Sequence, residues 1–80
     1  MKWLEAIGTA LREARNKEGM PQELAGDYVG KQQVWVSKVE RGLIDIKLVD
    51  FVQLSTLYGT TVSLLLVRAR DLVAASVRER

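Results

Sequence analysis

The sequence predicts an all-α domain of five helices, and three features of the chain indicate this fold class. Apolar residues recur at the three- and four-residue spacing that places them on one face of a helix. Glycines divide the chain at Gly19, Gly30, Gly42 and Gly59, and a glycine is common where a helix ends. The single proline, Pro21, lies where a helix would begin. Eighty residues suffice for one such domain.

Composition excludes several classes of protein. The chain contains no cysteine and no histidine, so a disulfide scaffold, a zinc site and imidazole-based catalysis are unavailable. The N-terminus becomes charged too early for a signal peptide, and the longest apolar run, from Val62 to Val67, is too short to cross a membrane. We therefore expect a cytoplasmic protein with no cofactor, no metal and no membrane contact. The net charge of +2 is small, so any affinity for nucleic acid requires local clustering of cations.

The first helix is expected over residues 2–17, and the second over residues 21–28. Trp3, Ile7, Ala10, Leu11 and Ala14 form the apolar stripe of the first helix, with Trp3 as a lid on the core. Four charged residues are expected on its outer face: Arg12, Glu13, Arg15 and Lys17. In the second helix, Gly26 is expected where this helix approaches the next one closely.

The third helix, expected over residues 32–41, has two faces of different chemistry. Val36 and Val39 share one side and form an ordinary core stripe. The opposite side presents an amide, a hydroxyl, two cations and a valine; its residues are Gln33, Val34, Ser37, Lys38 and Arg41. Such groups can contact base edges and phosphates. A solvated helix face is the alternative interpretation of the same composition.

The fourth helix is expected over residues 46–58, with Asp45 as its N-cap. A wide apolar face indicates a central core helix; it comprises Leu48, Phe51, Val52, Leu54, Ser55, Leu57 and Tyr58. Thr60 or Thr61 is expected to cap a fifth helix that begins near Val62 and continues to the end of the chain. The apolar stripe of this helix extends beyond what five small helices need, which favours a partner.

Residues 7–66 resemble the Cro/lambda-repressor-like (XRE-type) helix-turn-helix family of bacterial and phage transcriptional regulators. The resemblance rests on Ile7-Gly8, Leu11-Arg12, Arg15, Gly19, Gln22, Gly30 and the run Ser37-Lys38-Val39-Glu40-Arg41-Gly42. It implies a five-helix lambda-repressor-like DNA-binding domain over residues 1–66, and residues 67–80 then form a C-terminal helical extension. Leu43 and Ile44 depart from the family pattern, because related sequences often carry cations in this loop.

The resemblance also implies a DNA-binding transcriptional regulator, most simply a repressor that binds an inverted-repeat operator in double-stranded DNA. The base-reading candidates are Gln32, Gln33, Val34, Ser37 and Lys38. Backbone contacts are expected from Gln22, Lys31, Trp35, Arg41 and Lys47. In the family the residue equivalent to Gln22 also braces the residue equivalent to Gln33.

A homodimer is expected through the stripe on the fifth helix, formed by Ala69, Leu72, Val73, Ser76 and Val77. The alternative is that this helix folds back on its own chain. A second function hypothesis is an antitoxin or adaptor that holds a small protein partner through the C-terminal helix and binds DNA only for autoregulation. A catalytic role for Ser37 and Lys38 is rejected, because no third group is expected to activate them.

Overall fold

The computed structural model describes residues 1–78, and this part contains five helices and no strand. They are α1 (Trp3–Lys17), α2 (Gln22–Val29), α3 (Gln33–Glu40), α4 (Leu48–Leu57) and α5 (Val62–Arg78). The all-α fold class is confirmed. Each helix begins and ends within two residues of the expected position, except that residues 79–80 of the expected fifth helix lie outside the described residues.

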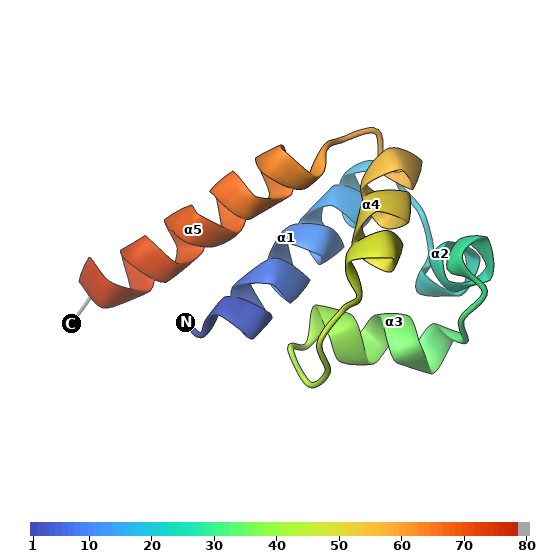
Figure 1. Cartoon of the computed structure of the whole chain (residues 1–80), viewed down its shortest axis with the longest axis horizontal. Helices are drawn as coiled ribbons and strands as arrows, with labels where there is room; N and C mark the ends of the chain where they lie inside the picture. Colours follow the sequence, from blue (N-terminus) through green and yellow to red (C-terminus); the bar gives the residue numbers. More distant parts are fainter. Residues whose placement is uncertain (79–80) are drawn as a thin grey trace.

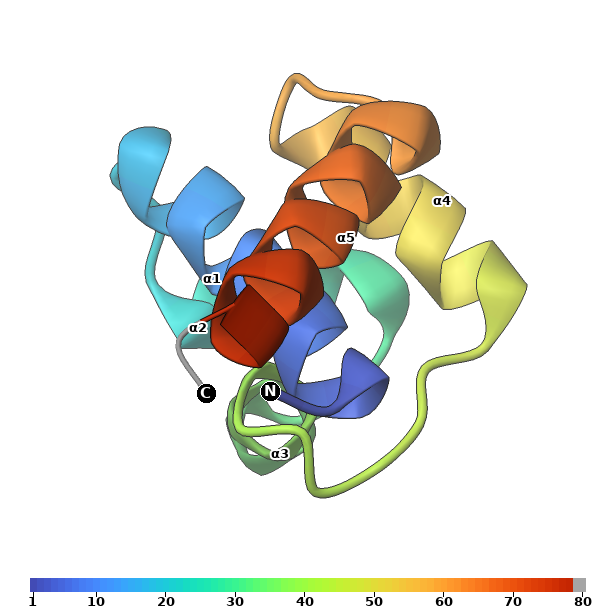
Figure 2. The ribbon, with the colours of Figure 1, turned by 90° about the vertical axis from the view of Figure 1, so that its left-hand side faces the viewer.

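The two longest helices, α1 and α5, lie side by side and run in opposite directions (Figure 1). The N-terminus and the end of α5 therefore lie at the same end of the molecule. Helices α2, α3 and α4 occupy the opposite end, with α3 along one outer edge. In the perpendicular view α3 again lies at this edge, and α5 and α4 lie above it (Figure 2). This arrangement leaves one side of α3 open to solvent.

The hydrophobic core lies where the helices meet. Leu11, Val36 and Leu54 are its largest fully buried side chains. Around them pack further buried residues from all five helices, including Ala10, Ala25, Val39, Phe51, Tyr58 and Leu65. Because Val36 and Val39 enter this core from α3, the rotation of α3 about its own axis is fixed by apolar packing.

Two glycines allow the helices around α3 to approach closely. A Cβ atom on Gly26 would lie 2.8 Å from the carbonyl oxygen of Lys31, and one on Gly8 would lie 2.6 Å from that of Glu40. Neither contact could be accommodated without a backbone shift. The expected close approach at Gly26 is therefore confirmed, and Gly8 performs the same task between α1 and α3.

Two expectations about α1 are wrong. Trp3 is 51% exposed and is not a lid on the core, because it lies before Ile7, the first residue of α1 that packs against the core cluster. Arg15 is buried rather than on the outer face. Its position on the helix follows Gly8 and Leu11 toward α3, and its charge is matched there by Glu40.

The wide apolar face expected for α4 is buried only in part. Phe51, Leu54, Ser55 and Tyr58 are buried, whereas Leu48 is 70% and Val52 46% exposed. The reason is that nothing within residues 1–78 covers the outer side of α4. The N-cap expected at Asp45 lies instead at Lys47, which has no side-chain cap, and the Asp45 carboxylate accepts a hydrogen bond from the N–H of Ile46.

Helix α5 packs along α1 over its described length. Its start is capped by Thr61, whose hydroxyl accepts a hydrogen bond from the N–H of Leu64 at 3.1 Å. Arg68 forms a bidentate pair with Glu13 of α1, at 2.9 and 3.0 Å. The boundary expected at residue 66 thus falls inside one continuous helix. Within residues 1–78, no single helix is long and apolar enough to span a membrane; α4 and α5 pass that test only as a pair bent by 101°.

Candidate nucleic-acid interface

The open side of α3 carries the side chains that the sequence pattern placed there. Gln33, Val34, Lys38 and Arg41 are exposed and Ser37 is half-buried, while Val36 and Val39 are buried. Gln32, the N-cap of α3, is exposed as well. The expected division of α3 into a core face and an open face is therefore confirmed.

The turn between α2 and α3 holds the two helices in a fixed relation. Gly30 ends α2 with φ 71°, in the left-handed region that glycine adopts without strain. The next residue, Lys31, donates its N–H to the carbonyl oxygen of Gly26 at 2.9 Å. This bond and the close approach at Gly26 fix the path of the chain directly before the open face of α3.

A buried ion pair joins α3 to α1. The Arg15 guanidinium donates to both carboxylate oxygens of Glu40, with Nε–Oε2 at 2.6 Å and Nη2–Oε1 at 3.0 Å, and Nη1 donates to the carbonyl oxygen of Met20 at 2.7 Å. The hydrogen bond to Glu40 raises the pKa of Arg15 above its ordinary value. Both side chains are almost fully buried, so the pair is a fixed point beneath α3.

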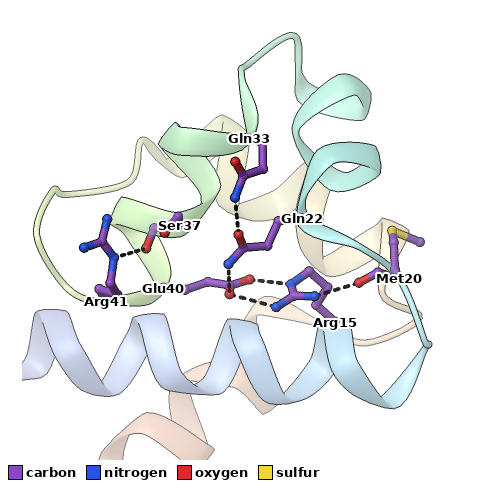
Figure 3. Close-up of polar contacts among 7 residues, drawn as sticks. All are labelled: Arg15, Met20, Gln22, Gln33, Ser37, Glu40 and Arg41. Carbon is purple, nitrogen blue, oxygen red and sulfur yellow. Dashed lines mark hydrogen bonds and ion pairs between the residues drawn. The ribbon is translucent and has the colours of Figure 1, made fainter.

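A chain of hydrogen bonds extends this pair to the surface (Figure 3). Glu40 Oε1 also accepts a hydrogen bond from Gln22 Nε2 at 2.9 Å, and Gln22 Oε1 accepts one from Gln33 Nε2 at 2.5 Å. The expected bracing of Gln33 by Gln22 is thus present. We call Arg15, Glu40, Gln22 and Gln33 the polar relay, because it connects the core to the first exposed residue of α3.

Sequence reasoning did not find the buried half of the relay. The sequence shows Glu40 only as part of a motif, and the apolar stripe of the first helix predicts Arg15 on the outer face. A signal for both was available in the helical spacing: Glu40 follows Val36 by four residues, and Arg15 follows Leu11 by four. Each of these charges therefore lies in line with a core residue, which indicates a buried pair when the two helices pack together.

Cations surround the open face of α3. Lys31, Lys38, Arg41 and Lys47 lie in the segment from residue 31 to 47, together with the acids Glu40 and Asp45, which gives 4 − 2 = +2. Since Arg15, from outside the segment, neutralises Glu40, the charge available to a ligand is 4 − 1 = +3. The interface is therefore more cationic than the sequence count indicates.

The remaining expected backbone contacts occupy the edges of this face. Lys31 Nζ lies 5.7 Å from the centre of the Trp35 ring, and both side chains are half-buried. Arg41 Nε donates to the carbonyl oxygen of Ser37 at 3.3 Å. Lys47 is exposed at the start of α4. All of them come from α3 or from the segments that flank it.

A buried tyrosine lies in the electrostatic field of the ion pair. The hydroxyl of Tyr58 has no hydrogen-bond partner within residues 1–78. Burial, and to a smaller degree the charge of Glu40, raises the pKa of Tyr58 to about 12. This side chain therefore remains neutral at any pH at which the protein would work.

Helices α2 and α3 are short and are joined by a glycine turn. One face of α3 lies in the core, and the other carries amides, a hydroxyl and cations. This arrangement defines a helix-turn-helix DNA-binding domain. A comparison with protein families agrees: residues 6–66, more than half of the chain, match the family model described as "Helix-turn-helix domain". The chain belongs to this family, in its Cro/lambda-repressor-like form. No match was found among curated protein sequences.

Solved structures support the same assignment. A crystal structure of the clp gene regulator ClgR from Corynebacterium glutamicum has a TM-score of 0.94 at 22% identity, over 99% of this chain and 84% of that one. A second ClgR structure gives a TM-score of 0.84 at 22% identity, over 89% and 91%. The restriction-modification controller protein C.AhdI from Aeromonas hydrophila has a TM-score of 0.72 at 32% identity, over 78% and 90%. This chain is a DNA-binding regulator of the same fold.

Proposed function

We propose that this regulator binds a specific DNA sequence by inserting α3 into the major groove. The observation that carries the proposal is the polar relay, which holds Gln33 in place from a buried ion pair. A side chain that is fixed before binding loses less conformational entropy when it contacts a base. An ordinary solvated helix face has no need of such an anchor.

Each exposed residue of α3 has a chemical role in this proposal. Gln33 offers an amide to a base edge, Val34 packs against a thymine methyl group, and Lys38 donates to the acceptors of a guanine. Gln32 and Ser37 lie beside them. The phosphate contacts come from Gln22, Lys31, Trp35, Arg41 and Lys47 at the edges of the face. These contacts position α3 without reading sequence.

Replacement of Lys38 tests the proposed facing of α3. Lys38→Ala should relax base preference at one position of the half-site, with a loss of about 1–3 kcal/mol on the preferred sequence. Lys17→Ala removes a lysine from the far end of α1 and is the matched control. Fluorescence anisotropy on the selected operator and on single-base variants measures both. Equal affinity and equal preference for Lys38→Ala and wild type would show that α3 does not read bases through Lys38.

We further propose a two-fold dimer that acts as a repressor on an inverted-repeat operator, with two α3 helices one helical turn apart. A charge of +3 around α3 is modest, and a second copy makes the second half-site contact effectively intramolecular. The contacts of α5 with its own chain limit which residues of the stripe can form the dimer contact. Ala69 is fully buried against its own chain, and the Ser76 hydroxyl accepts a hydrogen bond from the Met1 ammonium group. Val77, which is 64% exposed, then carries the contact, with the half-buried Leu72 and Val73 beside it.

A charged side chain at Val77 tests the dimer. Val77→Asp should give a folded monomer with weaker operator binding, because the change places a charge in the proposed contact but not in the monomer core. Arg78→Ala, which also lowers the net charge by one, is the neighbouring control for a change of charge alone. Sedimentation measures the mass, and circular dichroism measures the fold. A Val77→Asp protein that remains dimeric would exclude this surface.

The second candidate function is that of an antitoxin or adaptor that holds a small protein partner. Exposed apolar side chains on α4 favour this function, because Leu48, Val49 and Val52 are 70%, 67% and 46% exposed. The one charged residue between Leu48 and Val52, Asp50, is buried. Val49→Asp should then abolish partner binding and leave operator affinity unchanged.

An enzyme is not proposed. An open cavity of about 390 Å³ lies between α1 and α5 and contains neither Ser37 nor Lys38; its lining residues are Met1, Glu5, Leu72, Ala75 and Ser76.

A further inference from the structure

Lys31 is half-buried, whereas Lys38, Arg41 and Lys47, the other cations of the interface, are exposed. The backbone N–H of Lys31 donates to the carbonyl oxygen of Gly26, and the carbonyl oxygen of Lys31 lies so close to Gly26 that a Cβ there would be 2.8 Å away. Its ammonium group lies 5.7 Å from the centre of the Trp35 ring. This distance is within the range of about 6 Å at which a cation is attracted to the face of an indole ring.

Trp35 is itself fixed from the other side. Its ring packs against the core cluster, and its backbone N–H donates to the carbonyl oxygen of Gln32 at 3.0 Å, which fixes the main chain that carries the ring. Because one side of the indole is anchored in apolar packing, the ring provides a rigid surface under the lysine. The other cations differ. Arg41 Nε donates to the carbonyl oxygen of Ser37 in its own helix, and within residues 1–78 neither Lys38 nor Lys47 lies over an aromatic ring.

We infer that Trp35 is a positioning residue that holds the Lys31 ammonium ready for a DNA phosphate at the N-terminal end of α3. The inference rests on the proposed function, since it assigns a phosphate to this end of the helix. A free lysine side chain loses much rotamer freedom when it contacts a phosphate, whereas a lysine that already lies over a ring loses less. An indole is also the aromatic surface that attracts a cation most strongly.

A double-mutant cycle tests this on the full chain. Lys31→Ala should weaken operator binding in the wild-type background and weaken it less in the Trp35→Leu background. The coupling should be about two- to five-fold for each copy, and about four- to twenty-five-fold where two copies occupy one operator. Trp35→Leu combined with Lys47→Ala is the matched control, because Lys47 is a proposed phosphate contact on the loop after α3; these two changes should be additive.

The salt dependence of binding separates positioning from direct contact. Lys31→Ala should reduce the log–log slope by about 0.9 for each phosphate that is no longer neutralised. Trp35→Leu should lower affinity and leave this slope close to the wild-type value, because the charge remains. Additive effects of Lys31→Ala and Trp35→Leu would overturn the inference, and would show that each side chain acts alone. If Trp35→Leu is unfolded at 25 °C, Trp35→Phe replaces it, and Lys31→Ala must then cost less than in wild type.

A measurement on the free protein makes the two proposals separable. Ring currents from Trp35 should shift the side-chain protons of Lys31 upfield in the proton NMR spectrum, and Trp35→Leu should abolish the shift. Unshifted Lys31 protons in the wild type would overturn the positioning role even if the protein binds DNA. Shifted protons in a protein without affinity for any DNA would contradict the proposed function and leave the packing of Lys31 on Trp35 intact.

Discussion

Removal of the Glu40 carboxylate should affect stability more than any change on the open face of α3. Glu40→Ala leaves the Arg15 guanidinium, whose side chain is 11% exposed, without its carboxylate, and Gln22 without an acceptor. Breaking a buried ion pair from one side costs about 3–5 kcal/mol. A domain of this length has a total stability on the order of 4–12 kcal/mol. The variant should therefore lose at least a quarter of its stability.

Urea unfolding measures the loss. With a slope of about 1–3 kcal/mol per molar urea, the midpoint should fall by about 1 M or more. Glu23→Ala, which removes an exposed carboxylate from α2, is the control and should stay within about 0.5 kcal/mol of wild type. A Glu40→Ala protein within 1 kcal/mol of wild type would refute the argument that the pair is a fixed point beneath α3.

A double variant separates stability from the positioning of α3. Buried ion pairs can often be replaced by apolar side chains with little loss of stability, so Arg15→Met with Glu40→Leu should recover much of the loss. Gln22 and Gln33 would still lack their anchor. Since one such hydrogen bond contributes about 1 kcal/mol, operator affinity should fall about five-fold per half-site. Wild-type affinity in this stable variant would show that the polar relay has no part in binding.

Three further outcomes follow from buried or paired groups. Tyr58→Phe removes a hydroxyl without a partner and should raise the free energy of unfolding by on the order of 1 kcal/mol at pH 7. The pKa of Tyr58 is 10.0 in the unfolded chain and about 12 in the folded one. The free energy of unfolding of the wild type should therefore fall by about 2–3 kcal/mol as pH rises from 10 to 12, and urea titrations at alkaline pH should show no such fall for the variant. Gly8→Ala and Gly26→Ala should both lower the melting temperature despite the better helix propensity of alanine, and a rise for either would contradict the close approaches. The Arg68 hydrogen bond lowers the pKa of Glu13 below 4.5, so the pair stabilises the fold above that pH, and this stabilisation is lost as pH falls through the lowered pKa. The difference in stability between wild type and Glu13→Gln should therefore be small, because the pair is exposed, present at pH 7 and progressively lost in urea titrations below pH 4.5.

Much of the fold was predictable because its signals are local. Four glycines with positive φ end the helices or turns where the sequence placed them. The apolar spacing in α3 set which residues enter the core, and hence which face stays open. Such signals depend only on neighbouring residues and on the helical period.

The remainder depends on residues that are distant in the sequence. Arg15 and Glu40 are 25 residues apart, and their charges alone favour the surface; only the packing of α1 against α3 makes a buried pair. Leu48 and Val52 satisfy the helical pattern of a core face, but no element within residues 1–78 covers them. Trp3 has a large apolar side chain like those of core residues, but it lies outside the core. Helical periodicity shows on which face of its helix a residue lies, but it does not show which part of the chain packs against that face.

Selection of bound sequences from a random pool of duplex DNA, at a stated salt concentration, tests the central claim most directly. If two α3 helices enter successive major grooves on one side of the duplex, the selected sequences should share an inverted repeat. Its half-sites should be centred about 10–10.5 base pairs apart. Enrichment of a direct repeat or a single half-site would contradict the two-fold arrangement. A pool that shows no enrichment at low salt would contradict sequence-specific binding by α3.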